Sequence, residues 1–270
     1  MYLAFQRNHT HTKMNHKRFF AGVLVAAIFT GFSYLPASAQ MEFHFQYGSL
    51  KNPFSGEFHS TRILTFQHAG AWKLGGSFFF IDFLDDVEVD GFNDKEFYGE
   101  WYPTLSLSKL FGTTIKMGPI RDVSVIGGLN FDGDANVLKF LPGLQLSWQI
   151  PGFIFVNTGF TAMVDQSNEP LRTANGFMFD ISWLKVMNIG EQSFSFMGHA
   201  EYIAAVDQTD LGTKSEGWIL AQPQLVWDLG NAFGSPNWLH VGVELQYWRN
   251  KLGVKDQNEF RPELLVVWRL

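Results

Sequence analysis

The chain has 270 residues, a formal net charge of −6 and no cysteine. The lack of cysteine excludes disulfide bonds, thiolate metal sites and cysteine nucleophiles, and a net negative charge without a basic stripe argues against nucleic acid as a partner. Hydrophobic residues make up 46% of the chain and aromatic residues 16%, yet the mean hydropathy is −0.03. Apolar and polar residues are therefore interleaved, which favours an all-β protein over a bundle of membrane helices.

Residues 1–39 have the features of a secretory signal peptide. A basic segment that begins at Met14 precedes an apolar run, and Ala37-Ser38-Ala39 forms an A-x-A cleavage site. The apolar run is short for a membrane helix of about 20 residues, so a transmembrane anchor is the weaker alternative. We expect translation from Met14, cleavage after the A-x-A site, and a single mature domain over residues 40–270.

Twelve amphipathic stretches divide the mature chain. Their side chains alternate between apolar and polar, which is the pattern of β-strands whose two faces meet different surroundings. The stretches span residues 41–50, 60–69, 72–84, 95–109, 115–131, 137–149, 152–165, 174–186, 191–205, 216–228, 238–249 and 259–270. In the fourth stretch the apolar face carries Phe97, Trp101, Leu105 and Leu107.

The connections between the stretches also alternate. Those after odd-numbered stretches are polar and mostly acidic, whereas those after even-numbered stretches are mostly shorter. Outer-membrane barrels have short periplasmic turns and longer extracellular loops. We therefore predict an all-β protein, a transmembrane antiparallel β-barrel of about 12 strands in the bacterial outer membrane. A soluble periplasmic β-sandwich is the alternative, and the length of the stretches and the tryptophans near their ends argue against it.

A sequence resemblance supports this prediction. EWYPTLSLSKL (Glu100–Leu110), followed by KMGPIRDVSV (Lys116–Val125), resembles the nucleoside-specific outer-membrane channels of the Tsx type, although Tyr102 replaces the second acid of their motif. GSFFFIDFLD (Gly76–Asp85) is similar to the aromatic-rich third strand of that family and of related uncharacterised outer-membrane proteins of Bacteroidota. The resemblance implies a monomeric twelve-stranded barrel with a narrow lumen that passes nucleosides. We expect the diffusion of solute through it to be passive.

The third stretch contains candidates for solute binding. Asp82 is expected to face the lumen, because a charge facing lipid at mid-membrane costs a few kcal/mol. Alternation then places Phe78 and Phe80 in the lumen as well, where a nucleobase could stack on the rings at about 1–3 kcal/mol per stack. Hydroxyl and N–H groups of the solute could donate to Asp82, Glu100 or Tyr102. The alternative is that a narrow barrel fills its lumen with side chains in any case.

The other candidates are polar residues that alternation also places in the lumen: Asp122, Asn130, Asp180, His199, Glu201, Glu244 and Arg261. The acidic majority argues against an anion pore, which would need rings of arginine or lysine. It permits neutral or cationic solutes. We expect no metal and no cofactor, because the Asp-rich loop at 85–94 lacks the spacing of a calcium-binding loop.

Two other function classes stay open. An outer-membrane lipid hydrolase would need a serine–histidine pair on the lipid-facing side, and alternation places His199 and His240 in the lumen instead. A structural barrel with a plugged lumen is the stronger of the two alternatives. The expected partners are the lipid bilayer, a small solute and, during biogenesis, the barrel-assembly machinery.

Overall fold

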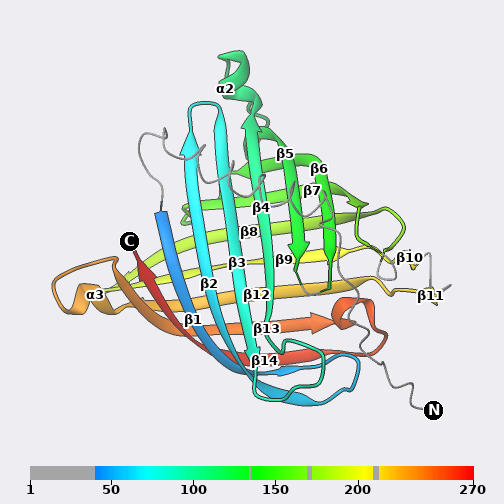
Figure 1. Cartoon of the computed structure of the whole chain (residues 1–270). Coiled ribbons are helices and arrows are strands. Elements are labelled where there is room, and N and C mark those ends of the chain that lie inside the picture. Colours follow the sequence, from blue (N-terminus) through cyan, green and yellow to red (C-terminus); the bar gives the residue numbers. More distant parts are fainter. Residues whose placement is uncertain (1–39, 134, 169–171, 209–212) are drawn as a thin grey trace, which may run out of the picture. The chain divides into compact units, whose positions relative to one another are not determined.

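The computed structural model describes residues 40–133, 135–168, 172–208 and 213–270, so the predicted signal peptide lies outside the described residues. Twelve strands form a closed antiparallel barrel (Figure 1). Each barrel strand pairs with the barrel strands before and after it in the chain, and the first strand pairs with the last. The predicted fold, an all-β barrel of about twelve strands, is confirmed, and a sheet closed on itself rules out the two-sheet sandwich.

The strands of the barrel agree with the predicted stretches to within a few residues at most ends. They are β1 (Gln40–Lys51), β2 (Phe58–Trp72), β3 (Gly75–Asp86), β4 (Glu96–Ser106), β5 (Ile120–Asp132), β6 (Val137–Trp148), β7 (Phe155–Asp165), β8 (Gly176–Ile189), β9 (Gln192–Ile203), β12 (Trp218–Asp228), β13 (Leu239–Arg249) and β14 (Glu259–Arg269). The agreement follows from the alternation of side chains, which marks a strand wherever its two faces meet different surroundings.

The fourth stretch is shorter than predicted. β4 stops at Ser106, and the short helix α2 (Leu107–Phe111) follows it, so Leu107 does not belong to the outer row of β4. The Ser106 side chain accepts a hydrogen bond from the Lys109 backbone N–H and thereby caps the helix. Gly112, in the left-handed conformation at φ 62°, ends it. Residues 112–119 then lead to β5, which begins later than predicted.

The two ends of the barrel differ less in loop length than predicted. We call the end at which β1 begins the turn end and the opposite end the loop end. The turn end has two-residue turns after β2 and β8, but its other connections include α2 and α3 (Leu229–Ala232). The loop-end connections include the small hairpin of β10 (Asp207–Gln208) with β11 (Thr213–Lys214), and the 3-10 turn η2 (Lys251–Gly253). No helix in the described residues is long and apolar enough to cross a membrane.

The barrel is polar inside and apolar outside. Glu42, His44 and Glu244 point inward and are at most 3% exposed, whereas outward residues such as Phe83 and Phe160 are 50% and 53% exposed. Similar outward apolar side chains occur on all twelve strands. A soluble protein rarely exposes so much contiguous apolar surface. The outer face therefore requires apolar surroundings.

Candidate functional site in the barrel lumen

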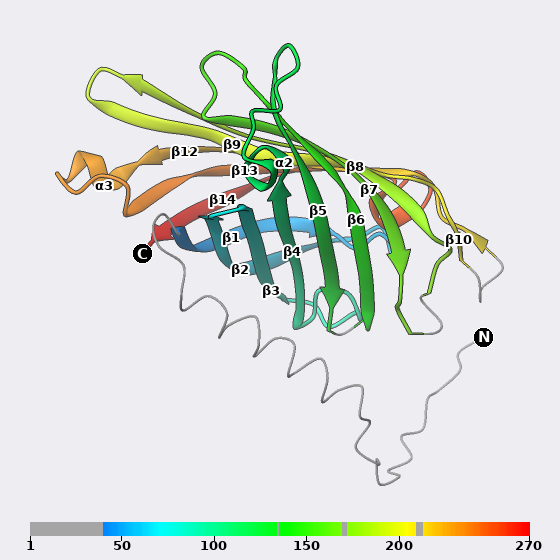
Figure 2. The ribbon, with the colours of Figure 1, turned by 90° about the horizontal axis from the view of Figure 1, so that it is seen from above.

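A cavity of about 440 Å³ lies inside the barrel, and all twelve strands contribute to its lining. It reaches the turn end at Gln40 and Phe155, the first residues of β1 and β7. β4 and β12 stand six places apart in the ring and form opposite walls (Figures 1 and 2). The cavity therefore brings together side chains that are far apart in the sequence.

Nine of the twelve predicted site residues line this cavity. They are Phe78, Phe80, Asp82, Glu100, Tyr102, Asp180, His199, Glu201 and Glu244. Alternation is the physical reason for this agreement, because a side chain whose neighbours in the strand face outward must itself face the lumen. Their role in binding a solute stays a prediction.

Asn130, Asp122 and Arg261 lie outside the cavity lining. Asn130 stands behind the wall residues of β4: its side-chain amide donates to Glu100 Oε1 at 2.9 Å, and its carbonyl accepts from the Tyr102 hydroxyl at 3.1 Å. It can orient those two side chains without touching a solute.

Asp122 and Arg261 are engaged elsewhere. Asp122 accepts hydrogen bonds from the hydroxyls of Ser106 at 2.5 Å and Ser108 at 2.6 Å, so it ties β5 to the start of α2. The Arg261 guanidinium lies 4.1 Å from the centroid of the Phe58 ring, near the loop end. Alternation predicts the face of a strand on which a residue lies, but it does not predict the depth of that residue along the lumen.

The β3–β4 wall combines aromatic rings with carboxylates. Phe78 and Phe80 have ring centroids 6.1 Å apart and stand opposite Tyr102 and Glu100 in the β3–β4 register. Asp82 follows on the same face. Its carboxylate accepts from the Thr65 hydroxyl at 2.5 Å. This wall therefore offers flat apolar surfaces directly beside hydrogen-bond acceptors.

The opposite wall carries amides around a carboxylate. Gln222 and Gln224 of β12 donate to the two oxygens of Glu244 at 3.1 and 2.5 Å, and Gln222 also donates to Gln246 at 2.7 Å. Both glutamines line the cavity, as does Gln67. None of the three was among the predicted solute contacts, although the same alternation that identified Glu244 also places them inside.

An ion pair joins the first and last strands at the turn end. Arg269 Nε lies 2.7 Å from Glu42 Oε1, and His44 Nε2 lies 2.8 Å from Glu42 Oε2. The side-chain amide of Gln40 donates to Glu42 at 2.6 Å. Glu42 is 3% exposed, so its charge depends on these partners.

Toward the loop end, several apolar side chains pack together inside the barrel. Leu141, Met163, Met178 and Ile203 form a buried apolar cluster, against which Tyr102 and Trp218 pack. We call these six residues the loop-end cluster. On the other side of the barrel, Lys251 Nζ pairs with Glu259 Oε2 at 2.6 Å, and both side chains are at most 3% exposed. The cavity lining extends from Gln40 at the turn end to Met178 and Glu201, which lie close to the loop-end termini of β8 and β9.

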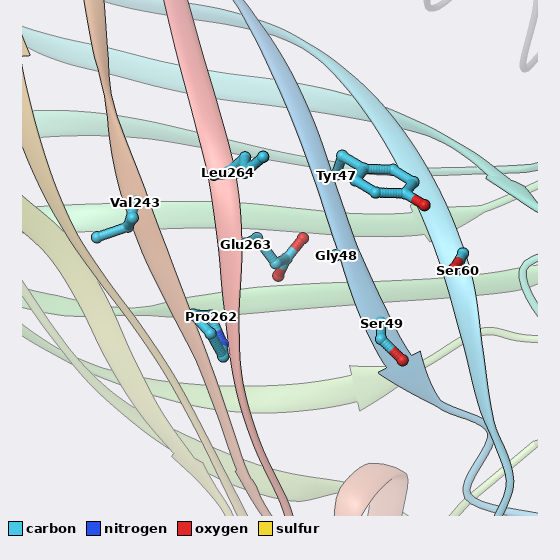
Figure 3. Close-up of a pocket in the computed structure, with 8 residues that line it drawn as sticks. All are labelled: Tyr47, Gly48, Ser49, Ser60, Val243, Pro262, Glu263 and Leu264. Atoms are coloured by element: carbon cyan, nitrogen blue, oxygen red, sulfur yellow. The ribbon is translucent and has the colours of Figure 1, made fainter.

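A second pocket, of about 330 Å³, lies on the outer face where β1 meets β14 (Figure 3). The two strands are paired from Glu42–Arg269 to Tyr47–Leu264 and not beyond. Just past this point the stem of Glu263 covers Gly48, where an added Cβ would lie 2.5 Å from Glu263 Cγ. Both carboxylate oxygens of Glu263 are buried and have no hydrogen-bond partner in the described structure.

No arrangement of three or more His, Asp or Glu side chains suited to a metal ion occurs within the described ranges. His199 and His240 both point into the barrel. The lipid hydrolase considered from the sequence would need its histidine on the outer face.

Comparison with known proteins identifies no family for this chain. No protein-family model and no curated protein matches it. Among solved structures, the chain is similar to the NanC porin (12% identity, 86% of this chain and 100% of that one, TM-score 0.49) and the KdgM porin (8%, 85% and 98%, 0.46). It is also similar to the translocator domain of the autotransporter NalP from Neisseria meningitidis (10%, 94% and 96%, 0.37). Likeness at this level carries no function from those proteins to this chain.

Proposed function

We propose that this protein is an outer-membrane channel through which small hydrophilic solutes diffuse passively, with nucleosides as the first candidates. The observation that carries the proposal is the polarity of the barrel, which has an apolar exterior around a polar cavity of about 440 Å³. A closed barrel satisfies its backbone hydrogen bonds internally, so it can stand in hydrocarbon. The predicted signal peptide agrees with export to that membrane.

Nucleosides fit the chemistry of the lining. The rings of Phe78 and Phe80 offer stacking surfaces for a base, and Asp82 and Glu100 lie beside them as acceptors for hydroxyl or N–H donors. The side-chain amides of Gln222 and Gln224 supply both donors and acceptors on the opposite wall. The resemblance to Tsx-type channels favours the same class of solute.

Conductance of the purified barrel in planar bilayers tests the proposal. We expect ion current through the wild type and a concentration-dependent reduction of that current by nucleosides. In the double variant Phe78→Ala with Phe80→Ala, each lost stacking interaction should raise the nucleoside concentration needed for the same reduction of current by about 5- to 150-fold. Phe83→Ala is the matched control, because Phe83 lies on the same strand but is exposed on the outer face.

Two outcomes would contradict parts of the proposal. A folded wild type that carries no current would contradict the channel. If the protein carries ion current but nucleosides neither reduce that current nor pass through the pore, the protein is a channel for other solutes.

A barrel without transport is the second candidate. The loop-end cluster favours it, because its buried side chains pack together near the loop end, and two of them, Tyr102 and Met178, line the cavity. A solute that leaves the cavity past this cluster requires that its side chains move aside. If the wild type is silent and a Leu141→Ala, Met163→Ala double variant conducts, the closed barrel is the correct description of the resting protein.

A further inference from the structure

The cavity lining contains many more acidic than basic side chains. Six carboxylates line it: Glu42, Asp82, Glu100, Asp180, Glu201 and Glu244. Of the described residues that line the cavity, Arg269 is the one arginine or lysine. Its guanidinium already pairs with Glu42 at 2.7 Å. Five lining carboxylates therefore have no cation in the lining to balance them.

Two pairs of carboxylates stand directly opposite each other on neighbouring strands. Asp180 of β8 is in register with Glu201 of β9, and Glu244 of β13 is in register with Glu263 of β14. Like charges in directly opposite positions destabilise a sheet. A positive charge or a proton between the two acids would stabilise each arrangement.

Two of these acids also lack hydrogen-bond donors. Glu201 is 7% exposed and accepts no hydrogen bond from the described residues. Glu263 is 1% exposed, and neither of its oxygens has a partner there. A buried polar group without a partner is costly. By contrast, Glu244 accepts from two glutamine amides.

The nearest lysines are committed to other acids. Lys139 attracts Glu201, but its ammonium lies 4.0 Å from the carboxylate of Asp165. Lys251 attracts Glu263, but it forms a 2.6 Å ion pair with Glu259. Neither lysine therefore forms its close ion pair with Glu201 or Glu263.

Five of these acids line the same cavity. Asp82 and Glu100 line it from the neighbouring strands β3 and β4, Asp180 and Glu201 from β8 and β9, and Glu244 from β13. Glu263 stands opposite Glu244 in the β13–β14 register but is not among the residues that line the cavity. We call the set of Asp82, Glu100, Asp180, Glu201 and Glu244 the acidic belt.

We propose that the lumen binds linear organic cations that carry two or more primary ammonium groups on an apolar chain, with the acidic belt as their receptor. The proposal rests on the proposed function, which places the belt on the path of a solute. Each ammonium group supplies three N–H donors. One such group can reach Glu201 and separate its charge from Asp180, while another meets Asp82 and Glu244.

The aromatic wall fits the same ligand. Phe78 and Phe80 lie next to the belt, where aromatic faces attract ammonium groups and cover methylene chains. A single metal ion is a poorer match, because the described residues contain no group of three or more suitably placed His, Asp or Glu ligands. A polyamine instead carries several separate charges, and the acidic belt likewise places its carboxylates on five separate strands.

Calorimetry of the purified, folded barrel in detergent at low salt tests the proposal with a diamine of four carbons, putrescine. We expect wild-type protein to bind putrescine and not 1,4-butanediol, its neutral counterpart, and to bind butylamine, with one ammonium, more weakly. Raising the salt concentration should weaken the binding of putrescine.

Amide variants locate the site. Asp180→Asn with Glu201→Gln keeps the side-chain shapes and should weaken putrescine binding about tenfold or more. Glu57→Gln with Glu88→Gln removes the same formal charge from exposed loop residues and should bind like the wild type. The mobility difference between heated and unheated samples in detergent gels confirms that each variant is folded.

The possible outcomes distinguish a failure of this inference from a failure of the proposed channel function. Equal affinity for diamine and diol, no diamine binding, or equal loss in both variant pairs would overturn the acidic belt as a receptor. Diamine binding to a protein that carries no current would contradict the channel and leave the receptor in place. Ion current without diamine binding would support the channel and contradict the receptor.

Discussion

Gly242 of β13 allows the backbones of β12 and β13 to approach closely. A Cβ at this position would collide with the carbonyl oxygen of Leu225 and lie 2.7 Å from the Cα of Val226. We expect Gly242→Ala to lower the free energy of unfolding by about 1–3 kcal/mol, as overpacking generally does. Urea unfolding from lipid vesicles, followed by tryptophan fluorescence, measures the change.

Gly127 of β5 is the matched control, because no atom lies within 4 Å of an added Cβ. Gly127→Ala should leave stability unchanged or raise it by about 0.5–1 kcal/mol, since alanine loses less backbone entropy in a strand. If both variants behave alike, the close approach at Gly242 is not what determines its residue type.

The ion pair of Glu42 with Arg269 gives a second residue-scale prediction. Removing one partner leaves a buried charge, so Arg269→Met should destabilise the barrel by about 3–5 kcal/mol, less any compensation from water because Arg269 is 15% exposed. Adding Glu42→Gln should recover part of that loss. A double-mutant cycle on urea midpoints measures the coupling, and strictly additive effects would contradict the pairing.

At the scale of single residues, the sequence predicts well on which face of a strand a side chain lies, but it predicts poorly which residues that side chain contacts. Glu201 and Glu244 could be placed in the lumen because period-two alternation is a local property of one strand. The engagement of Asp122 with Ser106 and Ser108 could not be predicted, because alternation contains no information on hydrogen-bond partners. The missing partners of Glu201 became evident only when all strands were in place.

Among the secondary-structure elements, α2 shows how one side chain holds a connection. Asp122 on β5 accepts from two serine hydroxyls at the junction of β4 and α2. We expect Asp122→Ala to release residues 107–119 from the wall and leave the barrel strands intact. Limited proteolysis should then cut this segment faster than in the wild type.

Glu191→Ala, in the two-residue turn after β8, serves as the control for Asp122→Ala. It removes a carboxylate at the same end of the barrel without touching α2. Faster cleavage in both variants would indicate general loosening of the turn end, contrary to a specific role for Asp122.

The positions of the strands could be predicted from the sequence, but the points at which a strand ends and a helix begins were harder to predict. Alternation continues through Leu107 and Ser108, so the pattern alone extends β4 too far. Ser106 and Gly112 are a serine cap and a terminal glycine, and they could have indicated a helix between them. The loop-end cluster had no local signal, because it joins residues of β4, of β6 to β9 and of β12 that are distant in the sequence.

For the whole molecule, a location in the membrane makes the cost of an outward charge depend on depth. Phe160, in the middle of β7, and Phe260, the second residue of β14, both face outward and are 53% and 61% exposed. Phe160→Arg should cost about 2–4 kcal/mol in lipid vesicles, and Phe260→Arg about 0–1 kcal/mol. Urea titration in vesicles compares the two.

Detergent micelles supply the contrasting condition, because their headgroups and water reach an exposed side chain more easily. The difference between the two arginine variants should shrink there. Equal costs in vesicles would mean that the outer apolar surface does not lie across a bilayer.

The short pairing between β1 and β14 affects the order in which the strand junctions of the barrel form and separate. The backbone pairing of the two strands runs only from Glu42–Arg269 to Tyr47–Leu264, whereas β1 pairs with β2 along its whole length. These residue pairs also connect the opposite ends of the described chain, so their formation carries the largest loop-closure entropy. We expect the β1–β14 junction to form last during insertion and to separate first when the barrel is pulled apart.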